Sequence, residues 1–227
     1  MMGNFEEQSS PISSTSDYLS KTFFRMFLGL FATALVAGYT YYSGMVETLI
    51  YSNSFVFIFI AELIVVIAFS LGFRKFSSGV VTALFFVYAI LTGVTFSTLF
   101  VIFELSSIFY VFLGSAAIFG ILALIGKNTT KDLSSFGTML SVTLLVGLVI
   151  SVINLFIGNT IVDIILDWII LFVFLGFTAY DMNKITHMNE LGVMEQEKLY
   201  VYGAMELYLD FVNIFLRILY IFGKRKN

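Results

Sequence analysis

The sequence predicts an all-α integral membrane protein with seven transmembrane helices. Hydrophobic residues make up 59% of its 227 residues and charged residues only 12%, whereas soluble domains average about 45–50% and about 25%. Seven continuous apolar runs are present, each close to the roughly 20 residues that a helix needs to cross about 30 Å of hydrocarbon. Aromatic residues reach 18%, which suits a surface that faces lipid.

The seven runs follow one another with short connections, and the longest connection is expected at residues 181–199. We read the runs as helices because they lack the alternation of apolar and polar residues that marks β-barrel strands. In lipid, only helices or closed barrels satisfy the backbone. Pro11 is the single proline and interrupts none of the runs, which cover residues 22–42, 54–73, 79–103, 107–125, 136–157, 164–180 and 200–222.

Residues 1–20 are polar and are predicted to form a disordered tail ahead of one transmembrane domain at 21–227. The tail carries Glu6 and Glu7 rather than the basic start and apolar stretch of a cleavable signal peptide.

The basic residues predict a cytoplasmic N-terminus, since Lys and Arg concentrate in cytoplasmic loops. Alternate connections carry them and the others have none. Three further basic residues, at 224–226, follow the seventh run on the side where this rule predicts few. The residues that set the orientation are Lys21, Arg25, Arg74, Lys75, Lys127, Lys131, Lys184 and Lys198. Short loops and the lack of cysteine fit a bacterial cytoplasmic membrane.

The composition argues against several function classes. There is no cysteine and one histidine, so iron–sulfur clusters, Cys-ligated zinc, histidine metal sites and Ser–His–Asp catalysis are disfavoured. The net charge of −3 provides no basic field for nucleic acid. We expect no resident cofactor and no enzymatic activity.

Polar residues inside the runs are the candidates for function, because a charge at bilayer depth costs about 2.5–3.5 kcal/mol on insertion scales. Glu62 lies near the centre of the second run, Asp181 ends the sixth, and Asn154 lies in the fifth. The seventh run carries a stripe on one helix face, because its members are spaced four, three and four residues apart: Glu206, Asp210, Asn213 and Arg217.

Asp181 and Asp210 could act as a pH sensor if their helices are neighbours. Two carboxylates that face each other in a low dielectric cannot easily both ionise, so they share a proton and titrate as a unit. Carboxylate and amide oxygens are also the ligands that Ca²⁺ takes. Asp181, Asp210, Glu62 and Asn213 offer part of such a shell, with Glu206 on the same path. Arg74 or Arg217 could pair with one aspartate as a latch.

Four segments resemble the Bax inhibitor-1 family, also called transmembrane Bax-inhibitor-motif proteins, in its bacterial branch. They are EL at 62–63, TTKDLS at 129–134 with Gly137, TAYD at 178–181 with KI at 184–185, and ELYLDFVN at 206–213. Their order and spacing extend the resemblance over roughly residues 20–223.

The resemblance implies six helices around a central seventh and a pH-sensitive Ca²⁺ leak gated by two aspartates. By motif position these are Asp181 and Asp210, while Glu62 is the family's acid in the second helix and Arg74 the nearest candidate for its latch. We expect a shared proton to hold the sixth and seventh helices together at low pH. Loss of the proton then favours an open state.

Three other functions remain possible from the sequence. An intramembrane aspartyl protease also needs two aspartates on adjacent helices, and Tyr180-Asp181 fits its first motif. The glycines expected before Asp210 and the proline-containing third motif are both missing. A proton-coupled exchanger would use the same acids, although no repeat or broken helix is visible. A regulator that binds other membrane proteins without transport is the third.

Overall fold

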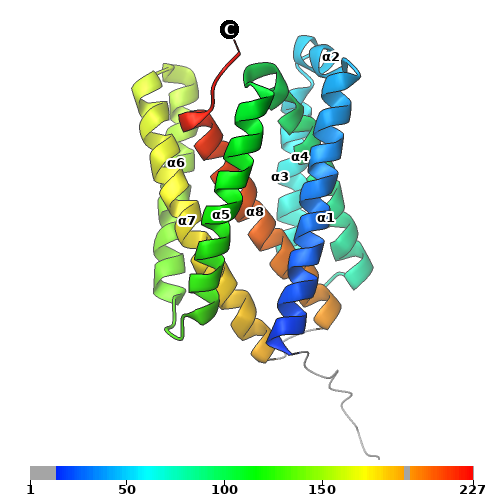
Figure 1. The fold of residues 1–227 in the computed structure, drawn as a ribbon, viewed down its shortest axis with the longest axis vertical. Coiled ribbons are helices and arrows are strands. Elements are labelled where there is room, and N and C mark those ends of the chain that lie inside the picture. Colours follow the sequence, from blue (N-terminus) through cyan, green and yellow to red (C-terminus); the bar gives the residue numbers. More distant parts are fainter. Residues whose placement is uncertain (1–13, 192–194, 227) are drawn as a thin grey trace, which may run out of the picture.

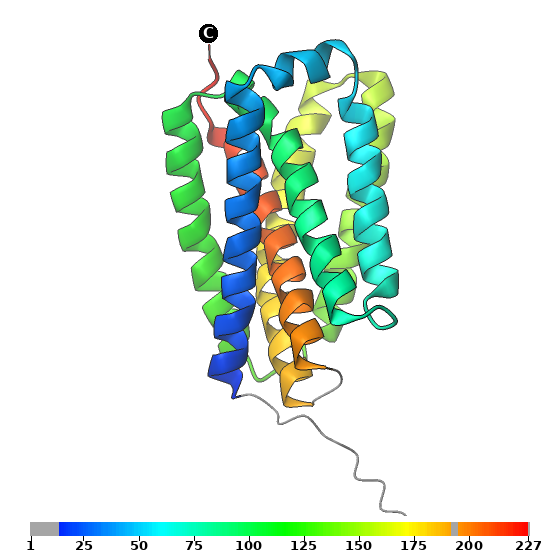
Figure 2. The same ribbon diagram turned by 90° about the vertical axis from the view of Figure 1, so that its right-hand side faces the viewer.

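The computed structural model describes residues 14–191 and 195–226, and the long elements in these ranges are helices. Figures 1 and 2 show them lying side by side, with the C-terminus at the end of the bundle opposite to the start of α1. The helices are α1 (Thr15–Tyr42), α2 (Met45–Tyr51), α3 (Phe55–Gly72), α4 (Ser78–Ile102), α5 (Leu105–Asn128), α6 (Ser134–Ile157), α7 (Thr160–Glu190) and α8 (Gln196–Phe222).

Six helices are long and apolar enough to cross a membrane, namely α1, α3, α4, α5, α6 and α7. They correspond to the first six predicted runs, so an all-helical integral membrane protein is confirmed. Helix α8 has 27 residues but is not among the six, and it is the helix that carries the acidic stripe. The total of seven crossings stays a prediction.

Helix α8 forms the centre of the bundle (Figure 2). Fifteen of its 27 residues are buried, against three of 18 in α3. It packs on α1, α4, α5 and α7, whereas α3 packs on α4 and α6 packs on α7. A central C-terminal helix is therefore as expected, but four helices form its immediate shell rather than six, and α3 and α6 lie outside that shell.

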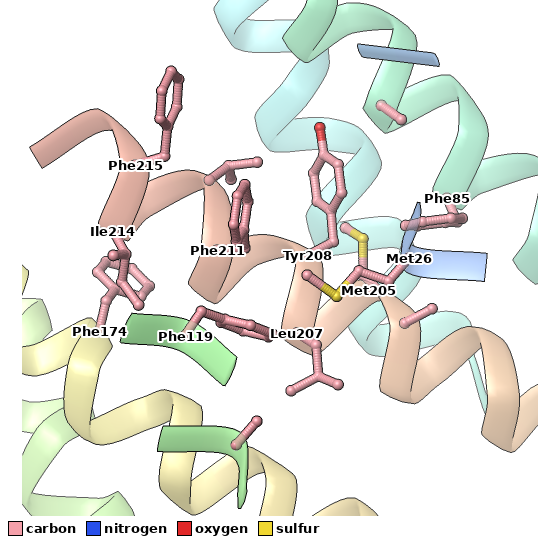
Figure 3. Close-up of a cluster of buried hydrophobic side chains, with 14 of the residues drawn as sticks. Met26, Phe85, Phe119, Phe174, Met205, Leu207, Tyr208, Phe211, Ile214 and Phe215 are labelled. Carbon is pink, nitrogen blue, oxygen red and sulfur yellow. The ribbon is translucent and has the colours of Figure 1, made fainter. Parts of the chain in front are cut away.

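Aromatic side chains from α8 fill the space between it and its neighbours (Figure 3). The ring of Phe211 lies edge-on to Phe119 of α5 at 5.7 Å, and Tyr208 lies edge-on to Phe85 of α4, also at 5.7 Å. In lipid, an apolar side chain gains little by leaving the bilayer. Dispersion contacts between such closely packed rings therefore stabilise the bundle.

Glycines let two pairs of helices approach closely, as is common in membrane bundles. A Cβ atom on Gly126 of α5 would lie 2.2 Å from the carbonyl oxygen of Ala179 in α7. One on Gly93 of α4 would lie 2.8 Å from the carbonyl oxygen of Thr33 in α1. Because backbone atoms cannot move aside, these contacts require glycine.

The turn between α6 and α7 is closed by side-chain amides. Gly158 ends α6 with a φ of 69°, a conformation that glycine adopts without strain. The Asn154 Nδ2 donates to the carbonyl oxygen of Asn159 at 2.9 Å and to Oδ1 of Asp163 at 2.6 Å. Asn154 is thus a structural residue that joins the ends of two helices.

Two boundaries differ from the predictions. Helix α1 begins at Thr15, so residues 15–20 of the predicted tail are helical, while residues 1–13 lie outside the described residues. Helix α7 continues to Glu190, through half of the predicted 181–199 connection. Its extension is polar, which suggested a loop, but Asp181, Ile185 and Asn189 recur every four residues and are all buried. This spacing is that of one helix face.

Candidate functional site

The two predicted aspartates lie on the packed pair of helices α7 and α8. Asp181 is 4% exposed and Asp210 is 3% exposed. Each lies inside its helix rather than at an end, and Asp210 is within electrostatic range of Asp181. The extension of α7 past Asp181 places that carboxyl group in the bundle interior.

Lys184 supplies the positive charge of the site. Its Nζ lies 3.4 Å from Oδ1 of Asp181 and 3.4 Å from Oε1 of Glu206. The ammonium group also lies 5.1 Å from the ring centre of Tyr202 and 5.7 Å from that of Tyr180, distances at which an aromatic face attracts a cation. One side chain of α7 thus bridges to α8.

The site has more acids than bases. Lys184 forms ion pairs with two carboxyl groups, those of Asp181 and Glu206, and a third, that of Asp210, is buried one turn beyond Glu206 on α8. The Oδ2 atom of Asp210 is buried and has no hydrogen-bond partner among the described residues. An ionised carboxylate with a free oxygen in a low dielectric is expensive, so this arrangement favours a proton on the group.

A polar pocket of about 370 Å³ connects Lys184 to the end of the bundle where α5 meets α6. Its lining includes Asn183 and His187 of α7 and Asp132 of the α5–α6 connection. Oδ1 of Asp132 accepts hydrogen bonds from the Ser134 hydroxyl at 2.6 Å and the Ser134 amide at 2.8 Å. These bonds hold the pKa of Asp132 below its usual range. Water therefore has a polar approach to Lys184.

Contacts with α5 position α7 beside this pocket. The Asn183 Nδ2 donates to the carbonyl oxygen of Thr129 at 2.6 Å and to that of Gly126 at 3.4 Å. The approach of Gly126 to Ala179 lies one helical turn away along α7. Together these contacts anchor the segment of α7 that holds Asp181 and Lys184.

Glu62 lies in a separate polar cluster. Its Oε1 accepts a hydrogen bond from Thr95 of α4 at 2.8 Å. On the same helix, Tyr88 lies edge-on to Tyr208 of α8 at 6.0 Å. The Tyr208 hydroxyl in turn lies 2.7 Å from Oγ1 of Thr33. The hydrogen bond of Glu62 thus goes to α4, whereas Lys184 joins Asp181 of α7 to Glu206 of α8.

The predicted calcium shell is not assembled in this structure. In the described ranges no three His, Cys, Asp or Glu side chains lie together closely enough to hold a metal ion. The grouping of Glu62 with Asp181 and Asp210 around Ca²⁺ stays a prediction. Glu62 is placed by α3, which packs on α4, whereas the aspartates lie between α7 and α8.

Comparison with known proteins identifies the family. A family model described as "Inhibitor of apoptosis-promoting Bax1" matches residues 15–227. The chain belongs to the Bax inhibitor-1 family. The inner membrane protein YbhL of Escherichia coli (strain K12) is 36% identical over 222 residues, covering 95% of each chain. An uncharacterized protein of Borreliella burgdorferi is 32% identical over 231 residues, covering 100% of each.

Neither predicted latch arginine of this Bax inhibitor-1 family protein pairs with the two aspartates. Arg217 forms an ion pair with Asp167 of α7. Arg74 is exposed, and its guanidinium lies 5.8 Å from the ring centre of Phe73. The ion pair with Asp181 that was expected of an arginine is formed by Lys184 instead. The sequence signal for it was the spacing of three residues from Asp181, which places both on one face of a helix.

The third member of the stripe, Asn213, forms a hydrogen bond within its own helix. Asn213 is half-buried, and its Nδ2 donates to the carbonyl oxygen of Leu209 at 2.8 Å, within its own helix. Its amide is therefore satisfied locally.

Proposed function

We propose that this Bax inhibitor-1 family protein is a pH-sensitive calcium leak of the bacterial cytoplasmic membrane, with its N-terminus in the cytoplasm. The proposal rests on one observation: two buried carboxyl groups, Asp181 and Asp210, lie between adjacent helices with a single ammonium group, Lys184. The relationship to an inner membrane protein supports the location. The leak is passive, with no enzymatic step.

The gate follows from the charge balance. At low pH the Asp210 carboxyl group is protonated and neutral. Lys184 then pairs with Asp181 and Glu206, and α7 stays packed on α8. As pH rises this proton is lost, and one ammonium group can no longer balance three carboxylates. Repulsion across the α7–α8 interface then favours a more open state, because a local charge change biases a two-state element.

The same oxygens provide the path for the ion. Ca²⁺ prefers carboxylate and carbonyl oxygens, and those of Glu206, Asp181 and Asp210 follow the α7–α8 interface. The polar pocket beside Lys184 is the entrance from the end where α5 meets α6. Asn213 lies one turn beyond Asp210 on α8 and continues the path, while Glu62 is left out of it.

The test is Ca²⁺ entry into proteoliposomes across a pH series, for the wild type, Asp181→Asn and Asp210→Asn. Both variants are expected to lose the pH response, because an amide cannot titrate. Asp17→Asn is the matched control, since Asp17 is exposed and pairs only with Lys21 of its own helix. Unchanged flux and an unchanged pH profile in both asparagine variants would contradict the proposal. Calcium accumulation driven by a proton gradient would indicate an exchanger instead.

A further inference from the structure

An apolar groove of about 310 Å³ lies between α1 and α5 and reaches α8. Figure 1 shows α8 behind the space between these two helices. The lining includes Ala34 and Ala37 of α1, Phe109 and Phe112 of α5, and Phe211 of α8. The alanines leave room that larger side chains would fill. An apolar groove that faces the bilayer holds no water, so it is suited to a hydrocarbon chain.

The lining of the groove is apolar except for one residue. Its one polar lining residue is Thr33, whose hydroxyl is already bonded to the carbonyl oxygens of Gly29 and Ala89 and to the Tyr208 hydroxyl. A ligand with hydroxyl or amide groups would lose hydrogen bonds on entering. The occupant of the groove itself is therefore purely apolar.

The C-terminal segment is fixed beside one end of the groove. The amide of Lys226 donates to the carbonyl oxygen of Ile102, and the amide of Glu104 donates to the carbonyl oxygen of Lys224, both at 2.9 Å. These bonds hold residues 224–226 against the α4–α5 connection. Phe100 and Leu105, which flank this connection, both line the groove.

Two of the three basic side chains there have no acidic partner in the described ranges. Lys224 pairs with Glu104 at 2.7 Å. Lys226, however, donates to the neutral oxygens of Phe100 at 2.6 Å and Tyr41 at 3.2 Å, and the Arg225 guanidinium lies over the Phe103 ring at 6.0 Å. These are also the charges that the orientation rule did not predict on this side.

We propose that this groove and the adjacent basic residues bind one anionic phospholipid. An acyl chain lies between α1 and α5, and the phosphate lies against Arg225 and Lys226. The charge complements two cations that lack acidic partners, and basic residues next to a membrane attract anionic lipids. This lipid site is independent of the proposed calcium leak, because the groove is lined by residues of α1, α4, α5 and α8 that include neither Lys184 nor Asp181, Glu206 or Asp210.

The test is native mass spectrometry of the full chain in detergent, with equal amounts of phosphatidylglycerol and phosphatidylcholine. The wild type is expected to retain phosphatidylglycerol about tenfold more than phosphatidylcholine. The double variant Arg225→Gln/Lys226→Gln is expected to lose this preference. Arg74→Gln/Lys75→Gln is the matched control, since it removes two exposed basic residues near another connection and should keep the preference.

A second pair of variants tests the groove. Ala34→Phe is expected to abolish retention of both lipids, because Ala34 is an exposed lining residue and the new ring occupies the groove without entering the core. Leu35→Phe, which changes an exposed side chain of α1 outside the lining, should retain lipid as the wild type does. Equal retention of the two lipids by the wild type would overturn the proposal. So would an unchanged preference in the double variant, or masses showing only detergent, free fatty acid or a dimer.

Discussion

Replacing Gly126 by alanine is expected to destabilise the bundle at the α5–α7 contact. The new Cβ atom would lie 2.2 Å from the carbonyl oxygen of Ala179, roughly 1 Å short of van der Waals contact. Because that oxygen belongs to a helix backbone, the two helices must separate. Overpacking of this kind typically costs about 1–3 kcal/mol. The displaced segment of α7 also carries Asp181, two residues further along the chain.

The matched control is Gly120→Ala on the same helix, where a Cβ atom meets nothing within 4 Å. Both substitutions gain up to about 1 kcal/mol of helix propensity, so the difference between the variants isolates the clash. At about 2–4 °C for each kcal/mol, Gly126→Ala should melt several degrees below Gly120→Ala in detergent, followed by circular dichroism. Equal melting temperatures for the two variants would refute the close approach of α5 and α7.

Three further predictions concern charge and hydrogen bonding. Lys184→Met should move the pH midpoint of calcium flux upward by about one unit or more, because the carboxyl groups then ionise without a counter-charge; a downward shift in proteoliposome assays would contradict this role. Asn154→Ala should lower the free energy of unfolding by about 1–3 kcal/mol, since Asp163 loses a buried partner; Asn213→Ala, which removes a bond within one helix turn, should cost less in the same thermal melts. Asp132→Ala should destabilise the protein near neutral pH, and this difference should shrink as pH falls through the lowered pKa of Asp132, because the bonds from Ser134 favour the ionised group; a pH-independent difference in melting temperature would contradict this role of the two bonds.

The helices could be predicted from the sequence because the bilayer sets their length and composition. Six apolar runs correspond to helices that can cross a membrane. The extension of α7 could not be seen in the same way, because the residues after Asp181 are polar and their burial depends on packing. The short helix α2 lies in a connection, where length gives no signal. The central place of α8 followed from the family resemblance rather than from periodicity.

The site was predicted only in part, because an acid's position along its helix does not reveal which neighbour it faces. Asp181 and Asp210 were found from their depth, and the structure brings their helices together. Glu62 has a similar depth but faces Thr95 on another helix. The sequence predicts a loop position for Lys184, since the predicted end of its helix lies before it. Its role depends on the contact with Glu206 across the helix pair.

The ion pairs between α7 and α8 bear on how the chain enters the membrane. Helix α7 supplies Lys184 opposite Glu206 and Asp167 opposite Arg217, so opposite charges meet at two heights of one helical hairpin. Synthesis proceeds from the N-terminus, and α8 therefore emerges after the helices that surround it. A hairpin that arrives with these charges already neutralised has a smaller insertion penalty than α8 alone. The last two helices are thus expected to enter the bilayer as one unit.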